Sequence, residues 1–292
     1  MKKFDNGIYA DISNEDYHAS MGISKSLLDA MNKGAAYFVF ERNAPRFESL
    51  SLGLGTLVHC LLLEPKEYEN RYLIAPECDR RTKEGKATWE EFQNANDGSK
   101  KIVSAKDDSI AHSIAECAMA HPLISKYLQD QDGKAEVSIY FTDPTTDLQC
   151  KIRPDWLIVR EKDGRKKIIC IDVKTTSDFG NFASSVWNYR YHVQQEFYRH
   201  GLSIAYNVPL SDVEFYFAVV STSQSGAVYP CDFFDLADPY QPKGEAEYKR
   251  NLLQCKEFKD SKVLKPSVLE MPEWQLRICE KDLEEHHNNS IL

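Results

Sequence analysis

Apolar and polar residues follow two different spacings along the chain. Up to about residue 130, apolar residues recur every three or four positions, which is the spacing of helices that bury one face. From residue 135 they gather in short runs that turn residues separate, which is typical of β-strands. Helices followed by three strands, a helix and another strand predict an α/β core wrapped by N-terminal helices.

Helix signals occur in four segments of the first part, at residues 22–34, 55–65, 77–101 and 105–124. In the first segment, Ser24 or Ser26 can cap the N-terminus, and Gly34 follows the end. The second segment is apolar on most sides, which predicts a buried helix, and a polar link (43–53) precedes it. The third segment is polar with a basic front, which predicts a surface loop followed by a helix.

Strand signals follow at residues 136–143, 148–160, 166–176 and 213–222, with a helix predicted over 186–206. The remaining residues are polar, with short helical pieces and no clear motif. We expect one domain over residues 1–292. Its parts are a mainly helical region (1–130), a core (131–230) and a C-terminal extension (231–292).

Composition and charge narrow the class of protein. Apolar residues make up 42% of the 292 residues, which is enough for a sizeable core and argues against disorder. No apolar run is long enough to cross a membrane, and the start lacks the apolar segment of a secretory signal, so we expect a cytoplasmic protein. The net charge of −9 argues against a protein that coats nucleic acid, but it suits an enzyme with an acidic metal centre.

One predicted hairpin brings two carboxylates together. Asp163-Gly164 is the strongest hairpin turn signal in the chain. In a two-residue hairpin, the residue numbers of every two opposed residues add up to the same value. Asp155 and Asp172 give the same sum as the turn residues Asp163 and Gly164. This register places the two aspartates opposite each other, with Cβ atoms about 4.5–5.5 Å apart. The alternation of a strand puts Lys174 on the same face as Asp172.

Two opposed carboxylates repel each other, and burying them is costly unless a cation neutralises them. Mg²⁺ fits this role because it takes one or two carboxylates, waters and phosphate oxygens. The neighbouring Lys174 would orient the attacking water and stabilise charge on the phosphate. The pattern therefore predicts a metal-dependent phosphodiesterase. The alternative is that Asp172 and Lys174 only flank each other at a strand end and Asp155 caps a strand, and a bulge would break the register.

Pro154-Asp155 followed by Asp172-Val173-Lys174 resembles the PD…(D/E)xK arrangement of the restriction-endonuclease-like nucleases. The resemblance implies an α/β fold in which helices flank a mixed central sheet. In this chain the fold would carry an N-terminal helical elaboration.

Two further elements resemble the RecB-type branch of that fold. Gln194 and Tyr198 match its QxxxY element, and residues four apart share a helix face, so both can reach one site. Gly55 and His59 match its GxxxH element. A lone buried histidine is usually a core residue, but beside the other motifs we predict that His59 binds metal through a neutral imidazole.

Longer stretches resemble the exonuclease VIII (RecE-type) nuclease domain of prophages, over roughly residues 5–230. They are GISKSLLDAMNKGAAYFVFERNAP, LGLGTLVHCLLLEP and IAPECDRRTKEGK. The resemblance implies a Mg²⁺-dependent exonuclease, with Mn²⁺ able to substitute. It would degrade linear double-stranded DNA processively from 5′ to 3′ and leave 3′ tails for a single-strand annealing recombination protein. It also implies a homo-oligomeric ring, a tetramer, whose basic channel would reconcile DNA binding with the acidic net charge.

The resemblance also implies roles for individual residues. His59, Asp155 and Asp172 would bind metal together with the Val173 carbonyl. Lys174 would position the nucleophilic water.

Other residues are candidates for supporting roles. Gln194 and Tyr198 would contact the DNA backbone or brace the site. Glu136, at the opening of the strand before the hairpin, would add a carboxylate to the site, although strand-end glutamates are commonly solvated. Arg153 lies beside Pro154-Asp155 and would reach the phosphate.

A basic patch lies in the polar loop before the third predicted helix. Arg80, Arg81 and Lys83 form this patch. They would either grip phosphate or make a solvated surface.

The eight cysteines include no CxxC pair, which favours buried, reduced thiols. Some RecB-type relatives hold an iron–sulfur cluster through one early and three clustered late cysteines. Here Cys231, Cys255 and Cys279 are widely spaced, so we expect no cluster.

Three other functions compete with the exonuclease. An endonuclease of the same fold would not need a free DNA end, and a catalytically silent DNA-binding protein would show no metal-dependent turnover. A glycosidase built on the paired carboxylates would leave Lys174 and the Gln194–Tyr198 element without a role. Because a complete motif set follows Met1, we expect a free-standing nuclease.

Overall fold

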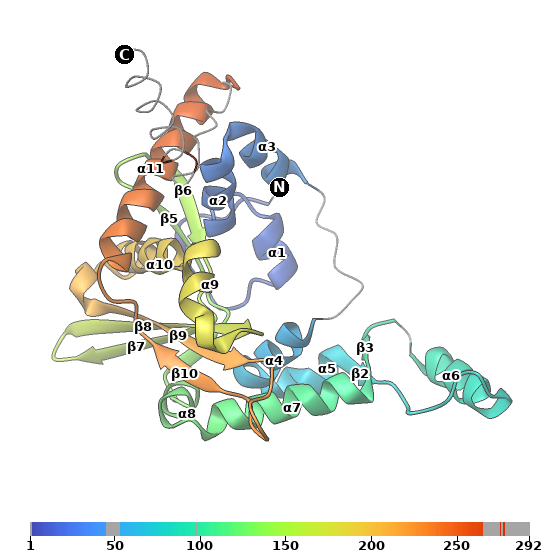
Figure 1. Ribbon diagram of the computed structural model, residues 1–292. Coiled ribbons are helices and arrows are strands. Elements are labelled where there is room, and N and C mark those ends of the chain that lie inside the picture. The colour runs from blue at the N-terminus through green and yellow to red at the C-terminus, as the bar shows by residue number, and fades with distance from the viewer. Residues whose placement is uncertain (1, 45–52, 97, 265–274, 276, 278–292) are drawn as a thin grey trace, which may run out of the picture.

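A computed structural model describes residues 2–44, 53–96, 98–264, 275 and 277 (Figure 1). Its strands are β1 (Gly7–Tyr9), β2 (Tyr72–Ile74), β3 (Lys101–Val103), β4 (Gly133–Ala135), β5 (Ser138–Thr142), β6 (Gln149–Ile152), β7 (Trp156–Lys162), β8 (Arg165–Thr176), β9 (Val213–Ser221) and β10 (Cys231–Phe234). Its helices are α1 (Asn14–Ala19), α2 (Lys25–Lys33), α3 (Ala35–Asn43), α4 (Leu54–Leu63), α5 (Tyr68–Arg71), α6 (Lys83–Ala95), α7 (Ala105–Ala120), α8 (Pro122–Leu128), α9 (Phe182–Asn188), α10 (Tyr191–Tyr206) and α11 (Tyr240–Ser261). Single 3-10 turns occupy Pro65–Glu67, Phe179–Asn181 and Leu210–Asp212.

The main sheet is mixed and has five strands in the order β10-β9-β8-β7-β4. Its central pair, β8 and β9, is parallel, and every other pairing in this sheet is antiparallel. A smaller sheet has the order β1-β5-β6. Helices cover both faces of the main sheet, so the predicted α/β fold with a mixed, helix-flanked sheet is confirmed (Figure 1).

The β7–β8 hairpin has the register that its turn predicts. Lys162 pairs with Arg165 across Asp163-Gly164, and Trp156 pairs with Ile171 at the far end. Both turn residues have positive φ, 53° for Asp163 and 73° for Gly164, which is the conformation that favours Gly and Asp or Asn there. No bulge shifts the pairing between these ends.

Alternate residues of β8 enter two separate cores. Ile168 and Cys170 pack in a core with side chains of α2, α10 and α11. Ile169, Ile171 and Val173 pack on the opposite face with side chains of α4, α7 and α8. Because the period of a strand is two residues, Asp172 and Lys174 belong to the α10 face, and Val173 belongs to the α4 face.

Three predicted elements are interrupted in the structure, each at an identifiable residue. The helix predicted over 105–124 ends at Ala120, because Pro122 disfavours helical backbone at His121, and α8 then begins. The run 148–160 forms β6 and β7, which belong to different sheets. The helix predicted over 186–206 breaks into α9 and α10 at Arg190, whose φ is 54°.

The C-terminal extension contains more structure than its sequence predicts. Residues Tyr240–Ser261 form one helix, α11, which packs on α10. A Cβ on Gly244 would lie 2.2 Å from the His192 carbonyl oxygen, so glycine permits this close approach. The apolar stripe of α11 is narrow (Tyr248, Leu252 and Cys255), and polar residues interrupt it, which is why its periodicity is weak.

The expected subdivision of the chain stays a prediction. Strands β1 and β10, which lie outside the predicted core, pair within the two sheets.

Most of the polar link 43–53, Cys279 and nearly all of residues 265–292 lie outside the described residues. Cys60, Cys150, Cys170 and Cys255 are buried free thiols, as expected, whereas Cys78, Cys117 and Cys231 are free thiols that are partly exposed. Among the described residues, no helix has both the length and the apolar character needed to span a membrane.

Candidate active site

The candidate site lies where β8 continues past the start of β7. Strand β7 begins at Trp156, whereas β8 continues beside β9 as far as Thr176. Pro154 precedes this start and has no N–H to donate to a ladder, which helps to end the pairing there. The backbone of Asp172 and Val173 is therefore accessible on that side to groups other than a strand.

Asp155 and Asp172 follow the last ladder pair of the hairpin, Trp156 with Ile171, so the register brings them near each other, while their direct pairing stays a prediction. Asp155 directly precedes β7, and its Oδ2 accepts a hydrogen bond from the Val173 amide at 2.8 Å. Burial, together with the negative charge of Asp172, raises the pKa of Asp155 well above its ordinary value. Two carboxylates in one poorly hydrated place are a local excess of negative charge that a cation would relieve.

Lys174 is held against this pair. Its Nζ lies 2.5 Å from Oδ2 of Asp172 and 4.6 Å from the ring centroid of Tyr191. Burial alone would lower the pKa of Lys174, but the charges of Asp172 and Asp155 outweigh it and raise the pKa. Lys174 therefore stays an ammonium at neutral pH, which suits charge stabilisation and the orientation of water.

Helix α10 supplies a second partner for Asp172. The Gln194 amide donates a hydrogen bond to Oδ1 of Asp172 from a buried position. Tyr198 follows one turn later, where burial and the nearby Asp172 and Asp155 charges raise its pKa well above the ordinary value. The QxxxY pair thus faces the carboxylates, in agreement with the shared helix face that its spacing predicts.

His59 reaches the site from the opposite face of the sheet, on α4. Its Nδ1 lies 3.8 Å from Oδ2 of Asp155. Burial lowers the pKa of His59, although the Asp172 charge and a backbone hydrogen bond with Val173 partly offset this. The imidazole is therefore neutral at neutral pH, which is the state that binds metal.

Gly55 explains how α4 comes so near to β8. A Cβ on Gly55 would lie 2.7 Å from Oγ1 of Thr175, which is closer than real side chains pack. The first turn of α4 therefore rests on the end of β8, and His59 follows one turn later. The glycine of the GxxxH element serves helix–strand packing, and the histidine serves the site.

We expect Gly55→Ala to lower the cleavage rate on linear DNA by about tenfold to a hundredfold, because displacements near 1 Å have effects of this size. Gly53→Ala is the matched control, since nothing lies within 4 Å of a Cβ there and its φ of −71° suits alanine. Initial rates on linear DNA check this. Adding Thr175→Ala to Gly55→Ala should restore activity, because it removes the side-chain oxygen that clashes. If this double variant stayed slow and Gly53→Ala were equally slow, the role of Gly55 in helix–strand packing would be contradicted.

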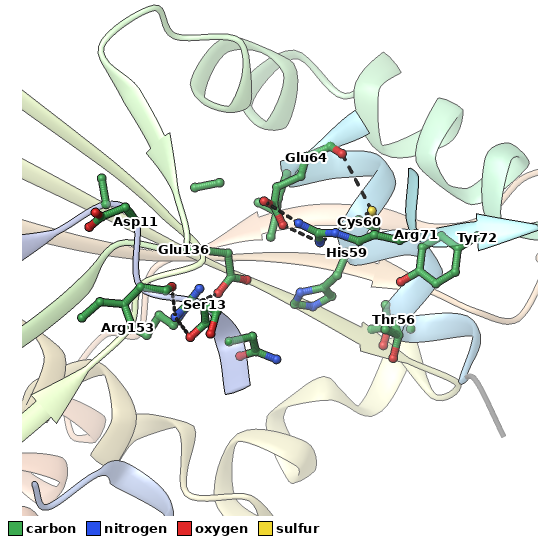
Figure 2. A pocket seen from close by; sticks show the side chains of 17 residues that line it. Asp11, Ser13, Thr56, His59, Cys60, Glu64, Arg71, Tyr72, Glu136 and Arg153 are labelled. Carbon is green, nitrogen blue, oxygen red and sulfur yellow. Dashed lines mark hydrogen bonds and ion pairs between the residues drawn. The ribbon is translucent and has the colours of Figure 1, made fainter. Parts of the chain in front are cut away.

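A cleft of about 770 Å³ adjoins the site, and His59, Glu136 and Arg153 are among the residues that line it (Figure 2). Glu136 does not open β5, as predicted, but lies between β4 and β5 with a left-handed φ of 54°. Burial raises the pKa of Glu136, the Glu64 and Asp172 charges add to this, and Arg153 opposes it. The Asp172 charge therefore acts on Glu136, while a catalytic role for Glu136 stays a prediction.

Arg153 is already bonded within the protein. Its Nε donates to Glu136 at 2.7 Å, and its Nη1 donates to the Ile12 carbonyl at 3.1 Å and to Ser138 Oγ at 3.0 Å. These bonds tie Glu136 in its left-handed conformation to the N-terminal segment (Figure 2). Contact between Arg153 and phosphate stays a prediction, and the structure adds a positioning role.

Arg80 and Arg81 precede α6, which lies at one end of the molecule, away from the main sheet (Figure 1). Arg81 is 91% exposed and pairs with Asp79. Arg80 lies 4.3 Å from the ring of Trp89. The structure does not bring these arginines to the carboxylate pair, so any DNA contact that they make is remote from it.

The donor set fits a divalent cation. Two carboxylates, a neutral imidazole and the Val173 carbonyl are oxygen and nitrogen ligands of the kind that such ions accept. Oδ2 of Asp172 is buried, and among the described residues it meets the Lys174 ammonium as an ion pair without a well-aligned hydrogen bond. Among the described residues, no group of three or more His, Cys, Asp or Glu side chains is arranged to hold a metal ion as it stands.

Tyr191 is the residue of this site that the motifs do not reveal. Its ring lies beside the Lys174 ammonium, and Nζ of Lys25 lies 5.9 Å from the same ring. Tyr191 precedes Gln194 by three positions and therefore shares its helix face, which is the signal that could have found it.

The chain is similar to one protein family and to solved structures. A family model described as "PDDEXK-like domain of unknown function (DUF3799)" matches residues 24–266. A crystal structure from Eubacterium rectale, named "Putative exonuclease", is 14% identical, with a TM-score of 0.51 over 89% of this chain and 96% of that chain. The SSO0001 structure is 13% identical over 78% of this chain and 85% of that chain, and its TM-score of 0.26 is too low to support an argument. No curated protein sequence matches.

Proposed function

Since the chain belongs to the DUF3799 family of PDDEXK-like domains, and so to the PD-(D/E)xK nuclease superfamily, we propose that it is a divalent-metal-dependent exodeoxyribonuclease acting on linear double-stranded DNA. One observation carries the proposal: Asp155, Asp172 and Lys174 meet at the open end of β8. The name of the Eubacterium rectale structure supports the exonuclease class.

The side chains of the site have separate tasks in this reaction. A bound divalent ion would supply Lewis-acid stabilisation of the phosphate and lower the pKa of a water, and His59, Asp155, Asp172 and the Val173 carbonyl would hold it. Gln194 orients Asp172 by bonding to its Oδ1. Lys174 keeps its positive charge at Oδ2 of Asp172, where it can orient the water and offset the charge that develops on the phosphate.

The finer features of the proposal rest on the resemblance to exonuclease VIII of the RecE type. They are Mg²⁺, or Mn²⁺ in its place, processive 5′→3′ digestion, 3′ tails for an annealing protein in recombination, and a ring tetramer. A ring with an acidic outside and a basic channel would reconcile the net charge of −9 with DNA binding. A cytoplasmic location would agree with this role.

The test uses a linear duplex labelled at each end in turn, beside a covalently closed circle, with Mg²⁺ or EDTA. Mg²⁺-dependent release of the 5′ label, with the circle untouched, is the expected result. Release of the 3′ label alone would reverse the proposed polarity. Cutting of the circle would identify an endonuclease, and no cleavage with any divalent metal would identify a DNA-binding protein.

A further inference from the structure

Two large aromatic side chains are exposed beside the candidate site. Trp187 at the end of α9 is 56% exposed, and Tyr189, between α9 and α10, is 61% exposed. Large aromatic rings in water are unfavourable by themselves, and an exposed ring next to a candidate site is a candidate contact for a ligand.

The ring of Tyr189 continues a stack that begins at Lys174. The Lys174 ammonium lies 4.6 Å from the centroid of the Tyr191 ring. The Tyr189 ring stacks on Tyr191, with centroids 5.7 Å apart and planes inclined by 29°. The stack therefore leads from an ammonium of the site to a ring that solvent can reach.

Trp187 has a similar arrangement two residues earlier. Its ring stacks on His192, with centroids 5.6 Å apart and planes inclined by 11°. Nζ of Lys243 lies 5.8 Å from the Trp187 ring. Each exposed ring is thus backed by an inner ring and has an ammonium nearby.

The segment that carries these rings is bonded to two neighbouring helices through Arg190. Arg190 lies between α9 and α10 with a left-handed φ of 54°. Its guanidinium bonds to Asp29 on α2 at 2.6 Å, and to Glu247 at 3.0 Å and Asn251 at 2.7 Å on α11. A ring presented by an anchored segment loses little conformational entropy when a ligand binds.

The local charge suits a nucleic acid but does not identify one alone. Lys25 donates to the Tyr189 carbonyl at 2.6 Å, so an ammonium lies at the base of the exposed ring. Lys25 also pairs with Asp29, and Lys243 also pairs with Glu247. The exposed ring faces are therefore what indicates a nucleic acid, because aromatic faces stack with bases of any sequence.

We infer that Tyr189, on the same exposed segment as Trp187, is a stacking platform for unpaired bases of the DNA strand whose phosphate enters the site. The inference rests on the proposed function and deepens it. Bases inside a duplex do not present their faces and a terminal pair presents only its outer face, so the platform favours nucleotides that are unpaired next to the scissile phosphate. It makes the candidate site selective for opened DNA ends.

The test measures binding of a fluorescein-labelled thymidine oligomer by anisotropy in EDTA. Tyr189→Ala should weaken binding by about tenfold, which is typical of losing one stacked base, and Tyr189→Phe should bind like the wild type. Tyr37→Ala is the matched control, because this tyrosine on α3 is 58% exposed and lies outside the platform. A 2-aminopurine placed in the oligomer should be quenched by the wild type and not by Tyr189→Ala.

Several results would overturn the platform. They are no oligomer binding by the wild type, unchanged binding or quenching in Tyr189→Ala, an equal loss in Tyr189→Phe, or an equal loss in Tyr37→Ala. Cleavage of linear DNA by the wild type is scored separately. Tyr189-dependent binding without any cleavage would refute the nuclease and keep the platform, whereas cleavage with Tyr189-independent binding would do the reverse.

Discussion

Asp172→Asn is expected to lower the cleavage rate on linear DNA by about a thousandfold. A metal ligand that stabilises the charge of the reaction contributes several kcal/mol, and each 1.4 kcal/mol changes the rate about tenfold. The fold should survive, because the asparagine Oδ1 can still accept the bond that Gln194 donates to Oδ1 of Asp172. Initial rates at saturating Mg²⁺ check the effect, with circular dichroism to confirm folding.

Asp163→Asn is the control for this variant. Asp163 lies in the turn of the same hairpin, at the far end from the site, and asparagine tolerates its φ of 53°. The same change of one carboxylate to an amide should leave the rate within about twofold, since surface charges at this distance are screened. Near-normal turnover in Asp172→Asn, or an equal loss in Asp163→Asn, would refute the site assignment.

Asp155→Asn is expected to stabilise the metal-free protein at neutral pH while abolishing its response to Mg²⁺. Burial and the Asp172 charge raise the pKa of Asp155. The stability that the Asp155 carboxyl contributes is therefore fully present below its pKa in the unfolded chain, about 3.9. It is lost as the pH rises through the higher pKa that this group has in the folded protein. At pH 7, folding must either bury this carboxylate beside Asp172 or bind a proton to it, and the amide avoids this cost.

Thermal unfolding in EDTA checks this, and a rise in the midpoint of about 2–4 °C would correspond to about 1 kcal/mol in a chain of this size. Added Mg²⁺ should raise the midpoint of the wild type, because ligands stabilise the state that they bind, and should leave the variant unchanged. A lower midpoint for the variant in EDTA, or an equal gain from Mg²⁺, would contradict the prediction.

Asp143→Asn serves as the comparison, because it should lower the thermal unfolding midpoint at neutral pH, whereas Asp155→Asn should raise it. Burial alone would raise the pKa of Asp143, but bonds from His200 at 2.9 Å and from Thr146 lower it to about 2. The stability that the Asp143 carboxylate contributes is present above the pKa of this group in the unfolded chain. It is lost as the pH falls toward the folded-state pKa of about 2. The amide should therefore cost about 2 kcal/mol at neutral pH, without changing the Mg²⁺ response.

The carboxylate pair could be predicted because its causes are local. Asp163-Gly164 sets the turn, the turn sets the register, and the register places Asp155 beside Asp172. The spacing of Gln194 and Tyr198 likewise puts both on one face of α10. Each of these relations depends on a few consecutive residues and on the fixed periods of a strand or a helix.

The placement of Glu136, Arg153 and the arginines before α6 could not be predicted in this way. Glu136 lies between the two sheets because β4 and β5 join different neighbours. Arg153 faces carbonyls of the N-terminal segment, which its own sequence neighbourhood does not reveal. Arg80 looks like a phosphate contact in the sequence, but its distance from the site depends on where α6 lies (Figure 1).

The sequence by itself determined the hairpin, the approach of Asp155 to Asp172 at its end, the side on which Lys174 lies and the helix face of the QxxxY pair. Only the tertiary structure decided that α4 approaches β8 at Gly55, that α11 forms and packs on α10, and that Arg190 holds Tyr189 beside the Lys174–Tyr191 stack. The physical reason is the range of the interactions. Turn chemistry and periodicity act within a few residues, whereas these placements depend on which distant surfaces pack together.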